Sequence, residues 1–141
     1  MGVFDVPVKL KNWRNRLLPE DRRGEGIECE AVVDPGAAEP ALPADLIERL
    51  RLEQTGEVQA YTADGGRHAY RVFGIVDLWV QGGSCRARAI ELRRGTRPLP
   101  GAIPLEEMDR HVRPQEKKLV PNPESPEGPL LPLCDVRPPC R

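Results

Sequence analysis

The residues in this chain best suited to carry out chemistry are grouped around a single carboxylate. The apolar residues 31–33 are followed at once by Asp34, Pro35, Gly36 and Ala37. The apolar run predicts a buried strand, and the proline and glycine after it predict a tight turn. Asp34 is therefore expected at the mouth of a turn, where the glycine lets another backbone or a substrate approach closely. A carboxylate in such a place can act as a general base on water.

One aspartate cannot also supply the acid that the same reaction needs. Two carboxyls about 3 Å apart solve this problem by sharing one proton, because both cannot ionise so close together. The chain has no second segment of this kind: Asp64 falls in a predicted turn, Asp45 in a predicted helix and Asp77 in a predicted strand. A catalytic pair therefore requires two copies of the chain, whose Asp34 side chains meet at a twofold axis.

The same four residues also have a purely structural interpretation. Proline followed by glycine suits a type II turn, whatever the neighbouring carboxylate does. A motif this short matches by chance often, so on its own it favours the plain turn. The rest of the chain has to decide between the two interpretations.

Length and charge limit the kinds of protein that this chain can be. Its 141 residues suit one domain, and its 21 basic and 22 acidic side chains nearly cancel. No overall field therefore attracts nucleic acid or an anionic membrane. The first residues lack the pattern of a leader peptide, and no apolar window is long enough to span a bilayer. We expect a soluble, cytoplasmic protein whose four cysteines, none of them closely paired, are reduced.

The hydrophobic pattern predicts a mainly β domain with one or two short helices. A helix is expected over residues 43–50, and a brief second helix begins at Pro104. Pro7 makes the first strand an edge strand at best. Half of the sixteen prolines lie from Pro114 onward, so residues 1–120 are expected to form the domain and residues 121–141 a proline-rich tail. Strands are expected at residues 3–12, 27–34, 57–62, 67–80, 84–92, 109–112 and 117–120.

Several segments in succession resemble the retropepsin-like (clan AA) aspartic proteases, especially their small single-domain prokaryotic members. The matching segments are AVVDPGAAE (31–39), ALPADL (41–46), YTADG (61–65), GAIPLEEMD (101–109) and LVPNP (119–123). They cover most of the chain in order, which makes the resemblance more specific than the Asp34 turn alone. It implies a closed or partly closed β-barrel lobe that dimerises so that two Asp-Thr/Ser-Gly loops face each other.

The resemblance also implies an activity and a set of site residues. The activity is aspartic-type endopeptidase action on a peptide or protein substrate by a homodimer, with no metal or organic cofactor. Asp34 takes the place of the catalytic carboxylate. The implied substrate-binding residues lie beside Asp34 and at the tip of a hairpin flap that closes over an extended peptide: Gly36, Ala37, Ala38, Ala63, Asp64 and Gly65.

Three prolines depart from the resembled pattern. Pro35 stands where the family has Thr or Ser, and it has neither the hydroxyl nor the N–H that cross-link the two loops there. Pro40 and Pro100 replace aliphatic residues. The alternative to a protease is therefore a catalytically inactive module of the same fold that binds peptides or dimerises.

Two further groups of residues suggest other functions. His68 and His111 could pair with cysteines around a metal, but these ligands are scattered without the short spacings that zinc sites use, so the histidines are expected to be isolated surface residues. Basic residues near Trp13 suggest nucleic-acid contacts, but Glu20, Asp21 and Glu25 dilute them and favour a solvated face. These basic residues are Lys9, Lys11, Arg14, Arg16, Arg22 and Arg23.

Overall fold

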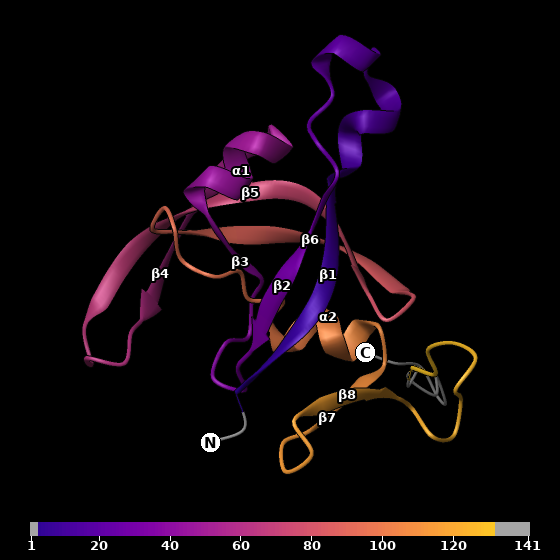
Figure 1. The fold of residues 1–141 in the computed structure, drawn as a ribbon. Coiled ribbons are helices and arrows are strands. Elements are labelled where there is room, and N and C mark those ends of the chain that lie inside the picture. The colour runs from indigo at the N-terminus through magenta and orange to yellow at the C-terminus, as the bar shows by residue number, and fades with distance from the viewer. Residues whose placement is uncertain (1–2, 132–141) are drawn as a thin grey trace, which may run out of the picture.

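The computed structural model describes residues 3–131, which form one curled sheet, a separate hairpin and short helices (Figure 1). The last ten residues of the predicted tail, which include Cys134 and Cys140, lie outside the described residues. The six-stranded sheet contains β1 (Phe4–Asn12), β2 (Ile27–Val33), β3 (Ala41–Pro43), β4 (Glu53–Tyr61), β5 (Arg67–Val80) and β6 (Gly83–Leu92). The remaining elements are the hairpin of β7 (Arg110–Arg113) and β8 (Lys118–Pro121), the helices α1 (Ala44–Leu50) and α2 (Ala102–Glu107), and the 3-10 helices η1 (Trp13–Leu17) and η2 (Glu20–Arg22).

The sheet runs in the order β2-β1-β5-β6-β3, and β4 pairs with β5 outside this path. Residues 98–99 bridge its two ends. Val32 of β2 donates its N–H to Pro98 at 2.8 Å, and Ala41 of β3 exchanges two backbone hydrogen bonds with Leu99 at 2.9 and 2.8 Å. The barrel expected from the resemblance is therefore found only in part: the described strands do not form a closed barrel, and single bridges span the remaining gap.

β1 corrects one expectation about Pro7. β1 is not an edge strand, because it lies between β2 and β5. Its pairing with β5 nevertheless covers only Lys9 to Asn12, while its pairing with β2 runs from Phe4 to Leu10. Pro7 therefore lies where β1 has a partner on one side only, and a missing N–H is tolerated there.

The core is formed by the inward-facing side chains of the strands and by the apolar face of α1. Phe4, Val6, Val8 and Leu10 of β1 are buried, and every second residue between them faces outward. α1 adds three buried side chains, and it ends at Arg51, which takes a left-handed conformation. The α1 side chains in the core are Leu46, Ile47 and Leu50.

Between β1 and β2 the chain makes an excursion, residues 13–26, that extends away from the sheet at the top of Figure 1. Asn12 fixes the point where it leaves β1. Its side chain is 4% exposed and donates to the carbonyls of Leu50 and Arg51 at 3.2 and 2.9 Å. The buried amide thus caps the end of α1 and joins the excursion to the core.

The predicted strands and helices agree with the observed elements to within about four residues, the largest difference being at the start of β4. The 3-10 helices η1 and η2 were not predicted, and neither was β3. The three residues of β3 are too few to show a pattern of alternating apolar and polar side chains. Residues 122–131 form turns after β8, with Ser125 bonded back to Asn122 at 3.0 Å. No helix among residues 3–131 is both long and apolar enough to cross a membrane.

Replacing Leu50 by alanine tests the importance of α1 for the core. Leu50 is 0% exposed, so we expect Leu50→Ala to lower the free energy of unfolding by about 2–5 kcal/mol through lost burial and a cavity. The matched control is Leu17→Ala on η1, where the side chain is 67% exposed and the change should stay within about 0.5 kcal/mol. Urea denaturation measures both, and equal losses would contradict this account of the core.

Candidate functional site

Asp34 lies in a turn directly after β2, and its side chain is exposed. One carboxylate oxygen, Oδ1, accepts a hydrogen bond from the Gly36 N–H at 2.9 Å. The N–H of Ala37 donates to the Asp34 carbonyl at 3.0 Å and closes the turn. Pro35 and Gly36 occupy the two middle positions, so the expected turn forms. It is not of type II, because Gly36 lacks the positive φ that a type II turn requires there. The turn therefore fixes the carboxylate of Asp34 while leaving it open to solvent.

The start of α2 holds the Asp34 turn in place from the other side. Ala102 and Ile103 donate their N–H groups to the carbonyls of Ala37 and Ala38, both at 2.9 Å. This approach requires Gly101, whose φ is +84°. A Cβ at this position would lie 2.5 Å from the carbonyl carbon of Glu39, which is closer than real Cβ atoms come. The glycine therefore permits the contact on which the geometry of the loop depends.

A cavity of about 190 Å³ opens beside Asp34. Two carboxylates, those of Asp34 and Glu106, border it together with the guanidinium of Arg110. Arg110 is engaged elsewhere, because its Nη2 donates to the carbonyl of Gln81 at 2.9 Å. The other lining residues are apolar or small: Val33, Pro35, Pro100, Gly101, Ala102, Leu105 and Val112. Such a cavity can receive an apolar side chain next to an exposed carboxylate.

The structure brings part of the predicted site together. Asp34, Gly36, Ala37 and Ala38 share one loop, which α2 fixes. The second group, at residues 63–65, forms the turn between β4 and β5, as the resemblance implies for a flap. In Figure 1 this hairpin extends away from the sheet, and its turn is separate from the loop after β2. No hydrogen bond or ion pair within residues 3–131 joins the turn to that loop.

The hairpin turn has hydrogen bonds of its own. The Asp64 carboxylate accepts from the Thr62 hydroxyl and from the Gly66 N–H, the latter at 2.8 Å. These bonds, with a smaller contribution from His68, lower the pKa of Asp64. Asp64 therefore stabilises the turn, and its carboxylate is bound within the hairpin.

Sequence reasoning did not assign the far wall of the cavity as part of the site. Gly101, Ala102 and Glu106 lie in a segment that carried the resemblance, so a signal for them existed. Arg110 and Val112 join the cavity only because α2 and β7 pack beside the Asp34 turn. Nothing in their local pattern indicates that placement.

Asp109 anchors the segment after β8 close to this wall. It is 9% exposed and has a φ of +54°. Its carboxylate accepts hydrogen bonds from the Leu130 N–H at 2.9 Å and the Asn122 amide at 2.8 Å, and His111 Nε2 lies 3.2 Å away. These partners, first of all the Leu130 N–H, lower the pKa of Asp109. The ionised carboxylate thus ties residues 122–130 to the end of α2.

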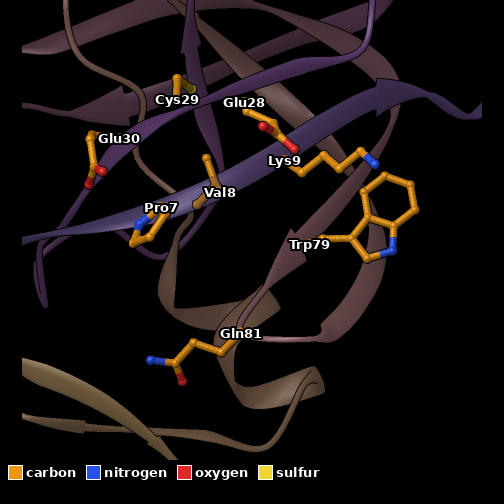
Figure 2. Close-up of a pocket in the computed structure, with 8 residues that line it drawn as sticks. All are labelled: Pro7, Val8, Lys9, Glu28, Cys29, Glu30, Trp79 and Gln81. Carbon is orange, nitrogen blue, oxygen red and sulfur yellow. The ribbon is translucent and has the colours of Figure 1, made fainter.

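A larger hollow of about 610 Å³ lies over β1, β2 and β5 (Figure 2). Glu28 and Glu30 supply carboxylates to its lining, while two of its other polar side chains are engaged elsewhere. Lys9 extends toward the Trp79 ring, with 5.7 Å between its ammonium and the ring centre, and the Gln81 amide donates to the Leu119 carbonyl at 2.9 Å. Burial, reinforced by Glu30, raises the pKa of the Cys29 thiol. A protonated thiol is a poor nucleophile, so this hollow is a weaker candidate than the Asp34 cavity.

The histidines and cysteines do not assemble a metal centre within residues 3–131. No group of three His, Cys, Asp or Glu side chains with a metal-binding arrangement was found there. His68 lies 3.7 Å from Asp64, and His111 belongs to the Asp109 cluster. Burial also raises the pKa of the Cys85 thiol, to about 11.

Comparisons with known proteins identify the fold. No protein-family model matches the chain, and no curated protein matches it. Among solved structures, the chain is similar to the retroviral protease-like domain of Ddi1 from Leishmania major, with 15% identity and a TM-score of 0.50 over 92% of this chain and 95% of that one. It also matches the simian foamy virus (mac) protease, with 15% identity and a TM-score of 0.49 over 72% and 90%. A protein of unknown function (DUF785) from Legionella pneumophila matches with 10% identity and a TM-score of 0.38 over 72% and 84%.

The likeness to the Ddi1 domain extends over nearly the whole of both chains. At 15% identity it shows the fold alone. The chain therefore has a mainly β, retropepsin-like fold with two short helices, as the resemblance in the sequence implied.

Two glycines with a similar positive φ test the contact between the Asp34 loop and α2. Gly101→Ala and Gly95→Ala both place a Cβ on a residue whose φ, +84° and +87°, is one that L residues rarely adopt. Gly95 has no atom within 4 Å of the added carbon, whereas Gly101 meets the backbone of Glu39 and Pro40. We expect Gly101→Ala to lower the free energy of unfolding by about 1–3 kcal/mol more than Gly95→Ala. Similar urea midpoints for the two variants would contradict the proposed contact.

The Asp109 cluster predicts a pH dependence of stability. A carboxyl whose pKa is lower in the folded state stabilises the fold fully above its unfolded pKa, and this stabilisation is lost as the pH falls through the folded pKa. Asp109→Asn should therefore be less stable than the parent above about pH 5, and the difference should shrink below about pH 4. Urea denaturation at several pH values measures the difference, and a constant one would contradict the role of the ionised carboxylate.

Proposed function

We propose that the protein is an aspartic-type endopeptidase that acts as a homodimer, with Asp34 of each copy as the catalytic carboxylate. The observation that carries the proposal is the exposed Asp34 carboxylate, held by its own turn and by α2 at the edge of a cavity. The retropepsin-like fold supports the proposal, and the exposure of this turn leaves it open to a second copy.

The proposed reaction uses a water molecule held between the two Asp34 carboxyls. One ionised carboxylate accepts a proton from the water as its oxygen attacks the peptide carbonyl carbon, and the protonated partner donates its proton to the carbonyl oxygen. The tetrahedral intermediate then collapses: one of its hydroxyl groups returns a proton to the ionised carboxylate as the C=O bond re-forms, the C–N bond breaks, and the leaving nitrogen takes the proton of the other carboxyl. The two carboxyls therefore hold one proton between them at the start and at the end of the reaction.

In this proposal an extended peptide binds between the Asp34 loop and the β4–β5 hairpin. Gly36, Ala37 and Ala38 supply backbone next to the scissile bond, and the turn at residues 63–65 closes over the peptide. The hairpin reaches away from the sheet in Figure 1, so closure requires it to bend toward the loop. A substrate side chain enters the cavity lined by Val33, Leu105 and their apolar neighbours.

A second candidate function is a noncatalytic peptide-binding or dimerisation module of the same fold. Pro35 is the observation that favours it, because its ring leaves no N–H or hydroxyl to bond across a dimer seam. Each hydrogen bond missing from that seam weakens it by about 1 kcal/mol. The two carboxyls can then lie too far apart to share a proton.

Asp34→Asn tests the catalytic assignment. An amide cannot accept the proton from water, so we expect cleavage of a fluorescently labelled, unstructured polypeptide to fall by about 10²-fold or more between pH 4 and 7. The matched control is Asp21→Asn on η2, an exposed aspartate in the excursion. Circular dichroism checks that both variants fold. Cleavage by Asp34→Asn at the parental rate would show that the catalytic residue is another one.

Pro35→Thr separates the two candidate functions. Threonine restores a hydroxyl and an N–H at the seam, so for an impaired protease we expect faster cleavage together with a tighter dimer by sedimentation velocity. No cleavage by either form, with peptide binding retained, would favour the noncatalytic module. A strictly monomeric protein at all concentrations would contradict the homodimer mechanism.

A further inference from the structure

A third hollow, lined by none of the residues of the Asp34 cavity, lies where the excursion leaves the sheet. Its volume is about 450 Å³, and we call it the basic groove. Three of its lining side chains are cationic and one, Asp77, is anionic. The lining residues are Lys11, Asn12, Trp13, Asn15, Arg16, Arg23 and Asp77.

The cations of the basic groove are available to a ligand. Arg86 pairs with Asp77 at 3.1 Å, so the single carboxylate of the groove is already neutralised. Within residues 3–131, no carboxylate lies within ion-pairing distance of Lys11, Arg16 or Arg23. By contrast, Arg14 of the same excursion is bound by Glu53. The groove therefore presents three positive charges that no carboxylate of the described chain balances.

The excursion holds these charges in fixed positions. Asn15 and Gly24 exchange two hydrogen bonds across it, at 3.2 and 3.0 Å. Gly24 packs so closely on α1 that a Cβ there would lie 2.1 Å from the Leu50 carbonyl oxygen. Arg23 Nε donates to the Leu18 carbonyl at 2.8 Å, which orients its guanidinium. Less side-chain freedom is then lost when an anion binds.

Trp13 positions the second guanidinium. The Arg16 guanidinium carbon lies 4.4 Å from the centre of the Trp13 ring, and that of Arg86 lies 5.8 Å away. Both distances suit cation–π contacts. Two guanidinium groups therefore lie near the indole and compete with a nucleic-acid base for its ring.

We infer that the basic groove binds an acidic segment of a polypeptide. The guanidinium groups of Arg16 and Arg23 and the ammonium of Lys11 can pair with two or three carboxylates. A guanidinium can bind a carboxylate through two parallel hydrogen bonds. A nucleic acid fits less well, because Arg16 and Arg86 compete with a base for the ring of Trp13. This inference does not depend on the proposed protease activity.

Binding of labelled peptides to the full chain tests the inference. The probe is fluorescein-labelled hexaglutamate, measured by fluorescence anisotropy, with hexaglutamine as the uncharged comparison. Hexaglutamate should bind, should weaken as NaCl is raised, and should bind on the order of tenfold more weakly to the double variant Arg16→Gln/Arg23→Gln. Lys11→Gln should weaken binding less, because it removes a single charge.

The matched control is the double variant Arg22→Gln/Arg93→Gln, which removes the same charge outside the groove lining. It should bind hexaglutamate as the parent does, and thermal unfolding checks that all variants fold. Three results would overturn the inference: no binding of hexaglutamate, equal binding of hexaglutamine, or equal weakening by the control variant. Tighter binding of an oligothymidylate than of hexaglutamate, lost in Arg16→Gln/Arg23→Gln, would identify a nucleic-acid site instead.

Discussion

The close approach of the Gly101 backbone to Glu39 and Pro40 is the constraint on which the candidate site depends. Only a residue without a Cβ fits there, and this fit lets α2 bond to the carbonyls of Ala37 and Ala38. The residues just before it, 98–99, bridge the two ends of the sheet. One short segment therefore both draws the sheet together and fixes the Asp34 turn, so the stability of the fold and the geometry of the site are coupled.

Pro35 has different consequences within one chain and between two. Within the chain the turn is complete, because Gly36 and Ala37 supply its N–H donors and the proline occupies a position that suits its fixed φ. Between two copies, a proline can donate nothing. Pro35 therefore leaves the position of the Asp34 carboxylate intact within each chain. It would weaken only the contact between two copies that the proposed two-carboxylate mechanism requires.

The excursion and the Asp34 loop are separate surfaces that rest on different supports. Asn12, Asn15 and Gly24 fix the excursion against α1, while Gly101 and α2 fix the loop. Binding of an acidic segment at the basic groove would leave the Asp34 cavity open. The two surfaces can then engage different parts of one polypeptide, which raises the effective concentration of the second contact once the first has formed.

The sequence alone determined the mainly β character, nearly all strands and helices, and the turn at Asp34, because these follow from local periodicity and from the conformations of proline and glycine. Tertiary structure decided what no local pattern encodes. Pro7 is tolerated in the inner strand β1 because β1 is paired on one side only at that residue. β3 forms because β6 and Leu99 supply its hydrogen-bonding partners. Arg110 reaches the cavity through packing of β7 against α2. Within residues 3–131, Arg14 pairs with Glu53, whereas Arg16 and Arg23 at the basic groove have no carboxylate within ion-pairing distance. These outcomes depend on contacts between residues far apart in the chain, and spacing along a sequence carries no information about such distances.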